Sequence, residues 1–172
     1  DEHGMNLTKA LLGTIIKYPV SSLGIDKKSG NIRTKKMGYF YADKDNFEDV
    51  QRSAGTFGMR HPLTFLLEAA DDIAYKTADI EDAVKKGCIS YERLLQELRG
   101  FRPEQQTEQY RRIVSWLEER FGKGVQRDYS RPDLYAVQNW VISAQGQMIA
   151  GVTDCFTANY GAIMDGSHGK DM

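Results

Sequence analysis

Apolar side chains recur every three or four residues along most of the chain, the spacing that places them on one face of an α-helix. Capping residues, prolines and glycines mark where each periodic stretch begins and ends, with Asn6 and Thr8 both suitable as the first cap. The pattern predicts helices over residues 8–17, 45–54, 61–86, 91–99, 103–122 and 130–164. Alternating, strand-like patterns are almost absent. The sequence therefore predicts an all-α helical bundle.

The clearest of these helices lies in the middle of the chain. Pro62 stands at its first position, where a missing N–H costs nothing, and Gly87 follows its last turn. At roughly 100° per residue, one sector of this helix collects four carboxylates and a tyrosine: Glu68, Asp71, Tyr75, Asp79 and Asp82. The apolar face lies opposite this acidic stripe.

Carboxylates one turn apart repel one another, so the stripe is either exposed to water or presented to a cation. A solvated face is the commoner arrangement for such a pattern. The other interpretation is a site for a metal or a polar ligand, since a hard divalent ion takes oxygen or imidazole ligands. The three histidines, His3, His61 and His168, have no HxxxH or HExxH spacing. The residues alone therefore show no complete metal site.

Residues 20–44 are rich in lysine and glycine and predict a long loop, with a short extended piece near 38–41. A loop of this length inside a compact domain is usually functional or disordered. Lys17 and Lys36 stand at its edges, with Lys35 beside the second. Lysines held against a bundle can neutralise phosphates, although solubilising surface charge is their more frequent role.

Composition narrows the function classes. The 172 residues carry 23 Lys and Arg against 24 Asp and Glu, and this net charge of −1 excludes a whole-chain polycation that coats nucleic acid. No apolar run reaches the length of a membrane span, so we expect no membrane partner. Cys88 and Cys155 form no CxxC pair, which fits a reducing, cytoplasmic setting, and we expect both to be buried as small apolar residues.

Four segments, in order along the chain, resemble the deoxyguanosine triphosphate triphosphohydrolases of the HD-domain superfamily. The most specific is the stretch 60–75 with its Glu-Ala-Ala-Asp-Asp-Ile core, followed by residues 79–82. The others are 4–8 with 17–19, then 35–40, and more weakly 156–166. The resemblance implies an HD-domain-type bundle that uses Mg²⁺ or Mn²⁺ to cleave a deoxynucleoside triphosphate, typically dGTP, into the deoxynucleoside and inorganic triphosphate.

The same resemblance assigns roles to individual residues. Asp71 matches the final metal-ligating aspartate of the catalytic centre. Tyr75 matches a residue that packs on the deoxyribose where a 2′-hydroxyl would clash, and Asp79 matches an acceptor for the sugar 3′-hydroxyl. Lys17 and Lys36 match positions that contact the triphosphate, with Lys35 as the alternative to Lys36.

The family's remaining metal ligands, a histidine and a His-Asp pair that precede this region, are not among these residues. We therefore expect residues 1–172 to be the downstream portion of one HD-type domain, inactive alone. Family members commonly form oligomers, often hexamers, and some respond to single-stranded DNA. Two alternatives stay open: a non-catalytic HD-type module that binds nucleotides or mediates oligomerisation, and a related phosphohydrolase acting on another nucleotide.

Overall fold

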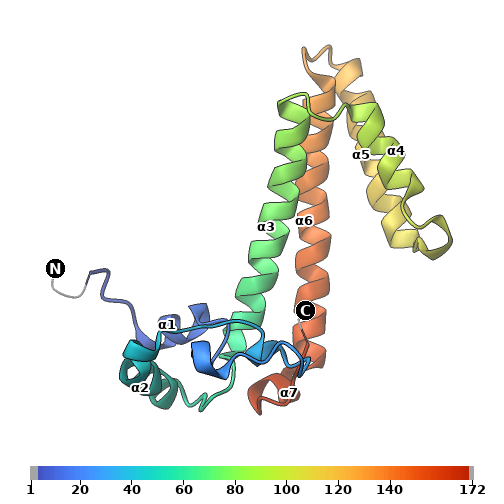
Figure 1. Cartoon of the computed structure of the whole chain (residues 1–172). Coiled ribbons are helices and arrows are strands. Elements are labelled where there is room, and N and C mark those ends of the chain that lie inside the picture. The colour runs from blue at the N-terminus through green and yellow to red at the C-terminus, as the bar shows by residue number, and fades with distance from the viewer. Residues whose placement is uncertain (1–3, 171–172) are drawn as a thin grey trace. The chain divides into compact units, whose positions relative to one another are not determined.

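The computed structural model describes residues 4–170 and is built of helices (Figure 1). The α-helices are α1 (Lys9–Ile15), α2 (Lys44–Ala54), α3 (Pro62–Lys85), α4 (Tyr91–Gly100), α5 (Glu108–Gln126), α6 (Pro132–Ala158) and α7 (Tyr160–Met164). Single 3₁₀ turns are η1 (Ser22–Gly24), η2 (Ile32–Thr34), η3 (Tyr41–Asp43) and η4 (Pro103–Gln105). Within residues 4–170 the one β-type pairing is an isolated bridge between Ser21 and Tyr39. The all-α prediction is confirmed.

Side-chain caps explain where several helices begin. The Thr8 hydroxyl accepts a hydrogen bond from the Leu11 N–H, so Thr8 is the cap of α1 rather than Asn6. Ser90 caps α4 in the same way, as its spacing predicts. Helix α3 begins at Pro62 and ends at Lys85, and both ends agree with the prediction. Helix α2 begins one residue before the predicted position, at Lys44.

Helix α1 ends at Ile15, two residues before its predicted end, because Ile16 is extended. Two other predicted helices differ more from the structure. Arg102 adopts the left-handed conformation, Pro103 opens only the single turn η4, and the Thr107 hydroxyl caps α5, which therefore begins at Glu108. Helix α5 then continues through Gly122 to Gln126, because a glycine inside a helix weakens it without ending it. The helix predicted over 130–164 begins at Pro132 and is divided at Asn159, between α6 and α7, where the Asn159 side-chain amide donates to the Cys155 carbonyl.

Two compact units make up the chain, and their boundaries fall inside α3 and α6. The first unit combines Asp1–Ala70 with Val152–Met172, and the second is Asp71–Gly151. Each unit has its own buried side chains, so each can be described separately. The single domain predicted over residues 1–172 stays a prediction.

The second unit is organised around an apolar core from four helices. Leu117 of α5 is completely buried there, together with Val137 and Trp140 of α6 and residues of α3 and α4. Two side-chain hydrogen bonds join α3 to α6 along this unit, where the helices run side by side in Figure 1. They are Gln138 Nε2 to Glu81 Oε1 at 2.9 Å and Gln145 Nε2 to the Thr77 hydroxyl at 2.7 Å. The core and these two hydrogen bonds determine which face of α3 is buried in this unit and which face is exposed to solvent.

In the first unit, the beginning of α3 is tied to α1. The buried Thr64 hydroxyl donates to the Thr14 carbonyl at 2.8 Å. Helix α1 also packs against α2, and Phe47 of α2 stacks on Tyr39 with ring centroids 4.0 Å apart. These contacts hold both ends of the long 20–44 connection against the unit.

The lysine-rich connection between α1 and α2 is more ordered than a plain loop. It contains η1, η2 and η3, and its bridge at Tyr39 matches the predicted extended piece. The Gly38 N–H donates to the Val20 carbonyl at 2.9 Å. A Cβ at Gly38 would lie 1.6 Å from the Tyr18 carbonyl oxygen, so only glycine fits there. This close approach fixes the segment around Lys36 beside the segment that follows Lys17.

The burial expected for the cysteines is not observed. Cys88 is exposed and Cys155 is half-buried. The cause for Cys88 is local, since it lies in the turn that closes α3, where its N–H donates to the Ala83 carbonyl. Across residues 4–170, no helix combines the length and apolarity needed to cross a membrane.

The environment of His61 makes the free energy of unfolding depend on pH. Its Nδ1 accepts a hydrogen bond from the Leu63 N–H and lies 3.2 Å from the Thr14 hydroxyl, and burial lowers the pKa of the imidazole. The unfolded chain therefore binds a proton more readily, near the ordinary pKa of about 6.5. The stabilisation is complete above that pH and is lost as the pH falls toward the lower folded-state pKa.

The intact polypeptide should thus melt at a lower temperature at pH 5.5 than at pH 7.5, and His61→Gln should reduce that difference. Thermal unfolding of both proteins at the two pH values checks this. An equal decrease in the two proteins would mean that other groups cause the acid sensitivity.

Candidate active site

Asp71, Tyr75 and Asp79 form an exposed line on α3. Successive members are one helical turn apart, so the line covers about 12 Å at 1.5 Å per residue. All three side chains point away from the core, and Tyr75 is 68% exposed. Within the described part of the chain, none of the three makes a side-chain hydrogen bond or an ion pair. These groups are therefore available to a ligand.

Other acidic residues of α3 are already paired. Asp72 bonds Lys76 and Asp82 bonds Lys86, each at 2.9 Å across one turn of helix. The hydrogen bond from Lys86 lowers the pKa of the Asp82 carboxyl. The carboxylates of the predicted acidic stripe therefore differ in whether they are paired. Asp82 belongs to an ordinary exposed ion pair within the helix.

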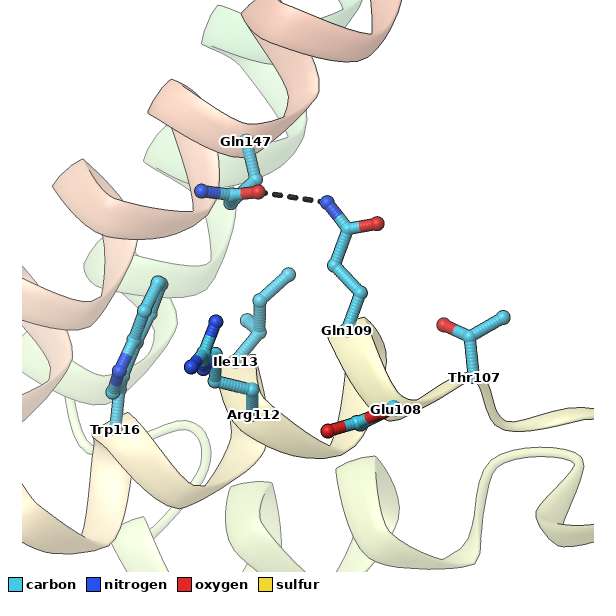
Figure 2. A pocket seen from close by; sticks show the side chains of 7 residues that line it. All are labelled: Thr107, Glu108, Gln109, Arg112, Ile113, Trp116 and Gln147. Atoms are coloured by element: carbon cyan, nitrogen blue, oxygen red, sulfur yellow. Dashed lines mark hydrogen bonds between the residues drawn. The ribbon is translucent and has the colours of Figure 1, made fainter.

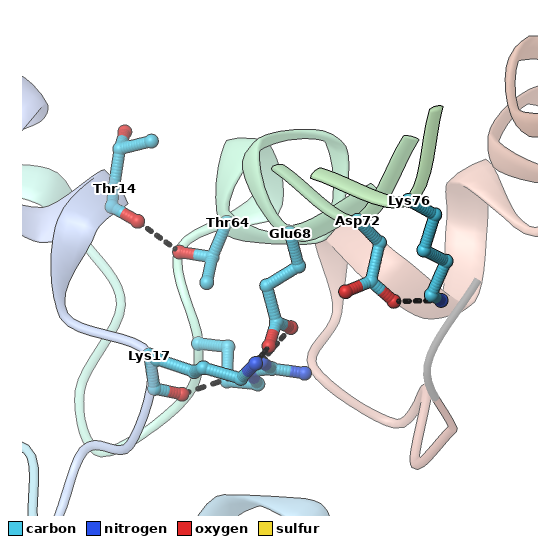
Figure 3. Close-up of polar contacts among 7 residues, drawn as sticks. Thr14, Lys17, Thr64, Glu68, Asp72 and Lys76 are labelled. Atoms are coloured by element: carbon cyan, nitrogen blue, oxygen red, sulfur yellow. Dashed lines mark hydrogen bonds and ion pairs between the residues drawn. The ribbon is translucent and has the colours of Figure 1, made fainter. Parts of the chain in front are cut away.

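Glu68 also differs from the rest of the predicted stripe. One of its carboxylate oxygens pairs with the Arg60 guanidinium. The other pairs with Lys17 Nζ (Figure 3). Arg60 is buried, and its Nε donates to the Lys17 carbonyl at 2.9 Å. Sequence reasoning missed Arg60, because Glu68 and Lys17 lie 8 and 43 residues away from it and no local pattern joins them.

The structure places Lys17 and Lys36 in adjacent segments of the first unit. Lys17 precedes Tyr18 and Val20, and these two residues contact Gly38, two positions after Lys36. Lys36 itself is exposed. The two lysines belong to the first unit and the Asp71 line to the second, so a common ligand for both groups stays a prediction.

The described residues do not form a complete set of metal ligands. Within residues 4–170, no group of three or more His, Cys, Asp or Glu side chains is arranged to hold a metal ion. His61 bonds the backbone of its own helix start, His168 packs edge-on against Phe65, and His3 lies outside the described residues. The exposed carboxylate of Asp71 suits a hard divalent cation as one ligand of several. Its remaining ligands would have to come from elsewhere.

A pocket of about 620 Å³ in the second unit does not contain the predicted site residues. Gln109 of α5 donates to Gln147 of α6 at 2.7 Å across the pocket. Arg112 and Trp116 line the pocket from α5, the helix that carries Gln109 (Figure 2). The candidate site is therefore defined by the exposed line on α3 and not by this hollow.

Comparison with known proteins shows which proteins the chain resembles along its length. No protein-family model matches the chain. A deoxyguanosinetriphosphate triphosphohydrolase-like protein of Listeria monocytogenes is 42% identical over 100% of the chain, as is one of Listeria innocua. The deoxyguanosinetriphosphate triphosphohydrolase of Yersinia enterocolitica is 31% identical over 98% of the chain. The chain is homologous to the deoxyguanosinetriphosphate triphosphohydrolases.

This homology confirms the resemblance seen in the sequence motifs. The match to the two Listeria proteins spans the whole chain, so every predicted site residue lies inside the region shared with the triphosphohydrolases. The chain covers about a third of the relatives' length, 36% in Listeria and 34% in Yersinia. Residues 1–172 are therefore comparable with about one third of each of these relatives.

Proposed function

We propose that the protein containing this chain hydrolyses a deoxynucleoside triphosphate, with dGTP as the first candidate, to the deoxynucleoside and inorganic triphosphate. The observation that carries the proposal is the exposed, unpaired line of Asp71, Tyr75 and Asp79 on a chain homologous to triphosphohydrolases from end to end. An HD-type arrangement of the helices is part of the proposal.

Asp71 is the proposed catalytic residue, acting as one ligand of a Mg²⁺ or Mn²⁺ ion. Its carboxylate is exposed and has no hydrogen bond or ion pair within residues 4–170, so it can bind a cation without first losing a protein partner. When bound, the metal supplies Lewis-acid polarisation of a phosphoryl oxygen and a more acidic water. We propose that the other ligands are supplied from outside this chain, and we therefore expect these 172 residues alone to be inactive.

Tyr75 and Asp79 are the proposed deoxyribose contacts. The Tyr75 ring offers an apolar surface one turn beyond Asp71, and a sugar packed on it leaves no room for a 2′-hydroxyl. The Asp79 carboxylate, one turn further, accepts a hydrogen bond from the 3′-hydroxyl. The 12 Å or so covered by the three residues is the scale of a nucleotide.

Lys17 and Lys36 are the proposed triphosphate contacts. A triphosphate carries several negative charges, and ammonium groups offset them through charge-assisted hydrogen bonds. Both lysines lie on segments fixed by the close approach of Gly38 to Tyr18. Lys35 is the alternative to Lys36, since the two are adjacent and both exposed.

One observation favours a second candidate function. Because residues 4–170 hold no three-ligand metal group, a non-catalytic module that binds nucleotides or mediates oligomerisation is the alternative. Assembly into a homo-oligomer such as a hexamer, and a response to single-stranded DNA, are further proposals for the intact protein.

Product analysis separates these functions. The intact polypeptide, supplied with Mg²⁺ or Mn²⁺ and dGTP, should release deoxyguanosine and inorganic triphosphate in equal amounts. Anion-exchange chromatography identifies the phosphate product. Release of pyrophosphate or orthophosphate would contradict the proposal, whereas dGTP binding without turnover would support the non-catalytic module.

Tyr75→Ala tests the sugar contact. Removing the ring should reduce the preference for dGTP over GTP, measured as the ratio of kcat/KM values, by about tenfold or more. Tyr129→Ala, which removes another exposed tyrosine of the second unit, is the matched control and should leave the ratio unchanged. An unchanged ratio in Tyr75→Ala would remove Tyr75 from the site.

A further inference from the structure

Arg60 is a buried cation, and its partners include a carboxylate, a main-chain carbonyl and an aromatic ring. Only 2% of its side chain is exposed. Its Nε donates to the Lys17 carbonyl at 2.9 Å, and its Nη2 pairs with Glu68. Its guanidinium carbon lies 4.8 Å from the centroid of the Phe65 ring. A guanidinium held on a ring, a carboxylate and a main-chain oxygen has little freedom to move.

Glu68 extends this arrangement to the ammonium group of Lys17. Its carboxylate, 16% exposed, bridges Arg60 on one oxygen and Lys17 Nζ on the other. Lys17 is therefore held at both ends, since Arg60 donates to its carbonyl. Its ammonium pairs with Glu68 (Figure 3). Lysine side chains on surfaces are normally free to move among many rotamers, and the ion pair with Glu68 favours the rotamers of Lys17 that reach this carboxylate.

The charges of Arg60, Glu68 and Lys17 leave the Lys17 ammonium able to attract an anion. Arg60 pairs with the carboxylate of Glu68 from the buried side, and the formal charges of these three side chains sum to +1. That charge lies on the most exposed member, Lys17, whose side chain is 46% exposed. An ammonium has three donors, and Glu68 uses only part of them. Glu68 thus orients Lys17 without cancelling its charge.

We propose that Arg60 and Glu68 are positioning residues that fix the Lys17 ammonium for contact with the phosphate oxygens of the nucleoside triphosphate. The inference rests on the proposed function, which assigns Lys17 to the triphosphate. A side chain already held in place loses less rotamer freedom when the anion binds, so fixing it strengthens binding. If Glu68 were instead a competing counter-ion, removing its charge would tighten anion binding. Removing the charge of Glu68 should therefore weaken anion binding if Glu68 positions Lys17, and strengthen it if Glu68 competes with the anion.

A double-mutant cycle on the intact polypeptide tests the proposal, with isothermal titration of inorganic triphosphate in Mg²⁺ buffer as the measurement. Lys17→Gln should raise the Kd about tenfold, the effect of one charge-assisted contact. Glu68→Gln should raise it about threefold or more, since the contact remains but loses its orientation. The double variant should match Lys17→Gln, because Glu68 acts only through Lys17. Lys9→Gln removes another half-exposed, ion-paired lysine and should leave the Kd unchanged.

The outcomes separate the inference from the function on which it rests. If Lys17→Gln weakens binding while Glu68→Gln leaves it unchanged, tightens it or adds its full effect to that of Lys17→Gln, the positioning role is wrong and the triphosphate contact stands. If Lys17→Gln itself has no effect, both the triphosphate contact and the positioning role are wrong.

If Glu68→Gln fails to fold, Glu68→Asp can test the positioning role in its place. It retains the negative charge that Arg60 needs and withdraws the carboxylate by one methylene from Lys17. Weaker triphosphate binding at an unchanged melting temperature supports positioning, because the net charge is the same. An unchanged Kd overturns it.

Discussion

Asp71→Asn should lower kcat/KM for dGTP by about 10³-fold or more in the intact polypeptide, since a metal ligand contributes several kcal/mol to transition-state stabilisation. Asparagine has the same shape as aspartate but lacks its charge, so it binds a divalent cation far more weakly. The melting temperature should not change, because the Asp71 carboxylate is exposed and makes no hydrogen bond or ion pair within the described residues. Initial rates of inorganic triphosphate release at a series of Mn²⁺ concentrations measure the effect.

Asp72→Asn is the matched control for this variant. Asp72 is the next residue of α3, is similarly exposed and pairs with Lys76, but it is rotated by roughly 100° from Asp71 about the helix axis. Its replacement should leave kcat/KM within about twofold of wild type, as for a surface ion pair. Near wild-type turnover in Asp71→Asn, or an equal loss in both variants, would remove Asp71 from the metal site.

Leu117→Ala should have the largest effect on folding. Leu117 is completely buried in the core of the second unit, where residues of α3, α4 and α6 surround it. Truncation removes apolar contacts and leaves a cavity, which costs about 2–5 kcal/mol of unfolding free energy. Chemical denaturation followed by circular dichroism measures the loss.

Val125→Ala gives the comparison on the same helix. Val125 is 55% exposed, so its truncation should change the unfolding free energy by less than about 0.5 kcal/mol. A loss below about 1 kcal/mol for Leu117→Ala would mean that the site collapses around the smaller side chain and that the core is not close-packed.

Local signals in the sequence predicted the helices well where they were unambiguous. Pro62 at the start of α3 and Ser90 at the start of α4 specify those helices through their own backbone and side chain, and both were predicted correctly. Pro103 was misleading because it can open either a long helix or a single turn. The left-handed Arg102 and the cap at Thr107 decided between them, and neither is visible in apolar periodicity.

The candidate site was only partly visible in the sequence. Helical spacing alone placed Asp71, Tyr75 and Asp79 on one face, and that placement is confirmed. The same spacing grouped Glu68 with them, yet the structure shows Glu68 paired with Arg60 and Lys17. A helical wheel carries no information about residues that approach from other segments, so it could not separate a free carboxylate from one already bound.

The placement of Asp71, Tyr75 and Asp79 on one uninterrupted helix has a consequence for how this region can diverge. One inserted or deleted residue between Asp71 and Tyr75 would rotate the following side chains by about 100° and shift them by 1.5 Å along the axis. The proposed sugar contacts would then lose alignment with the proposed metal ligand. Under the proposed function, exchanging side chains would alter the nucleotide contacts one at a time, whereas a change in the length of this segment would misalign all of them at once.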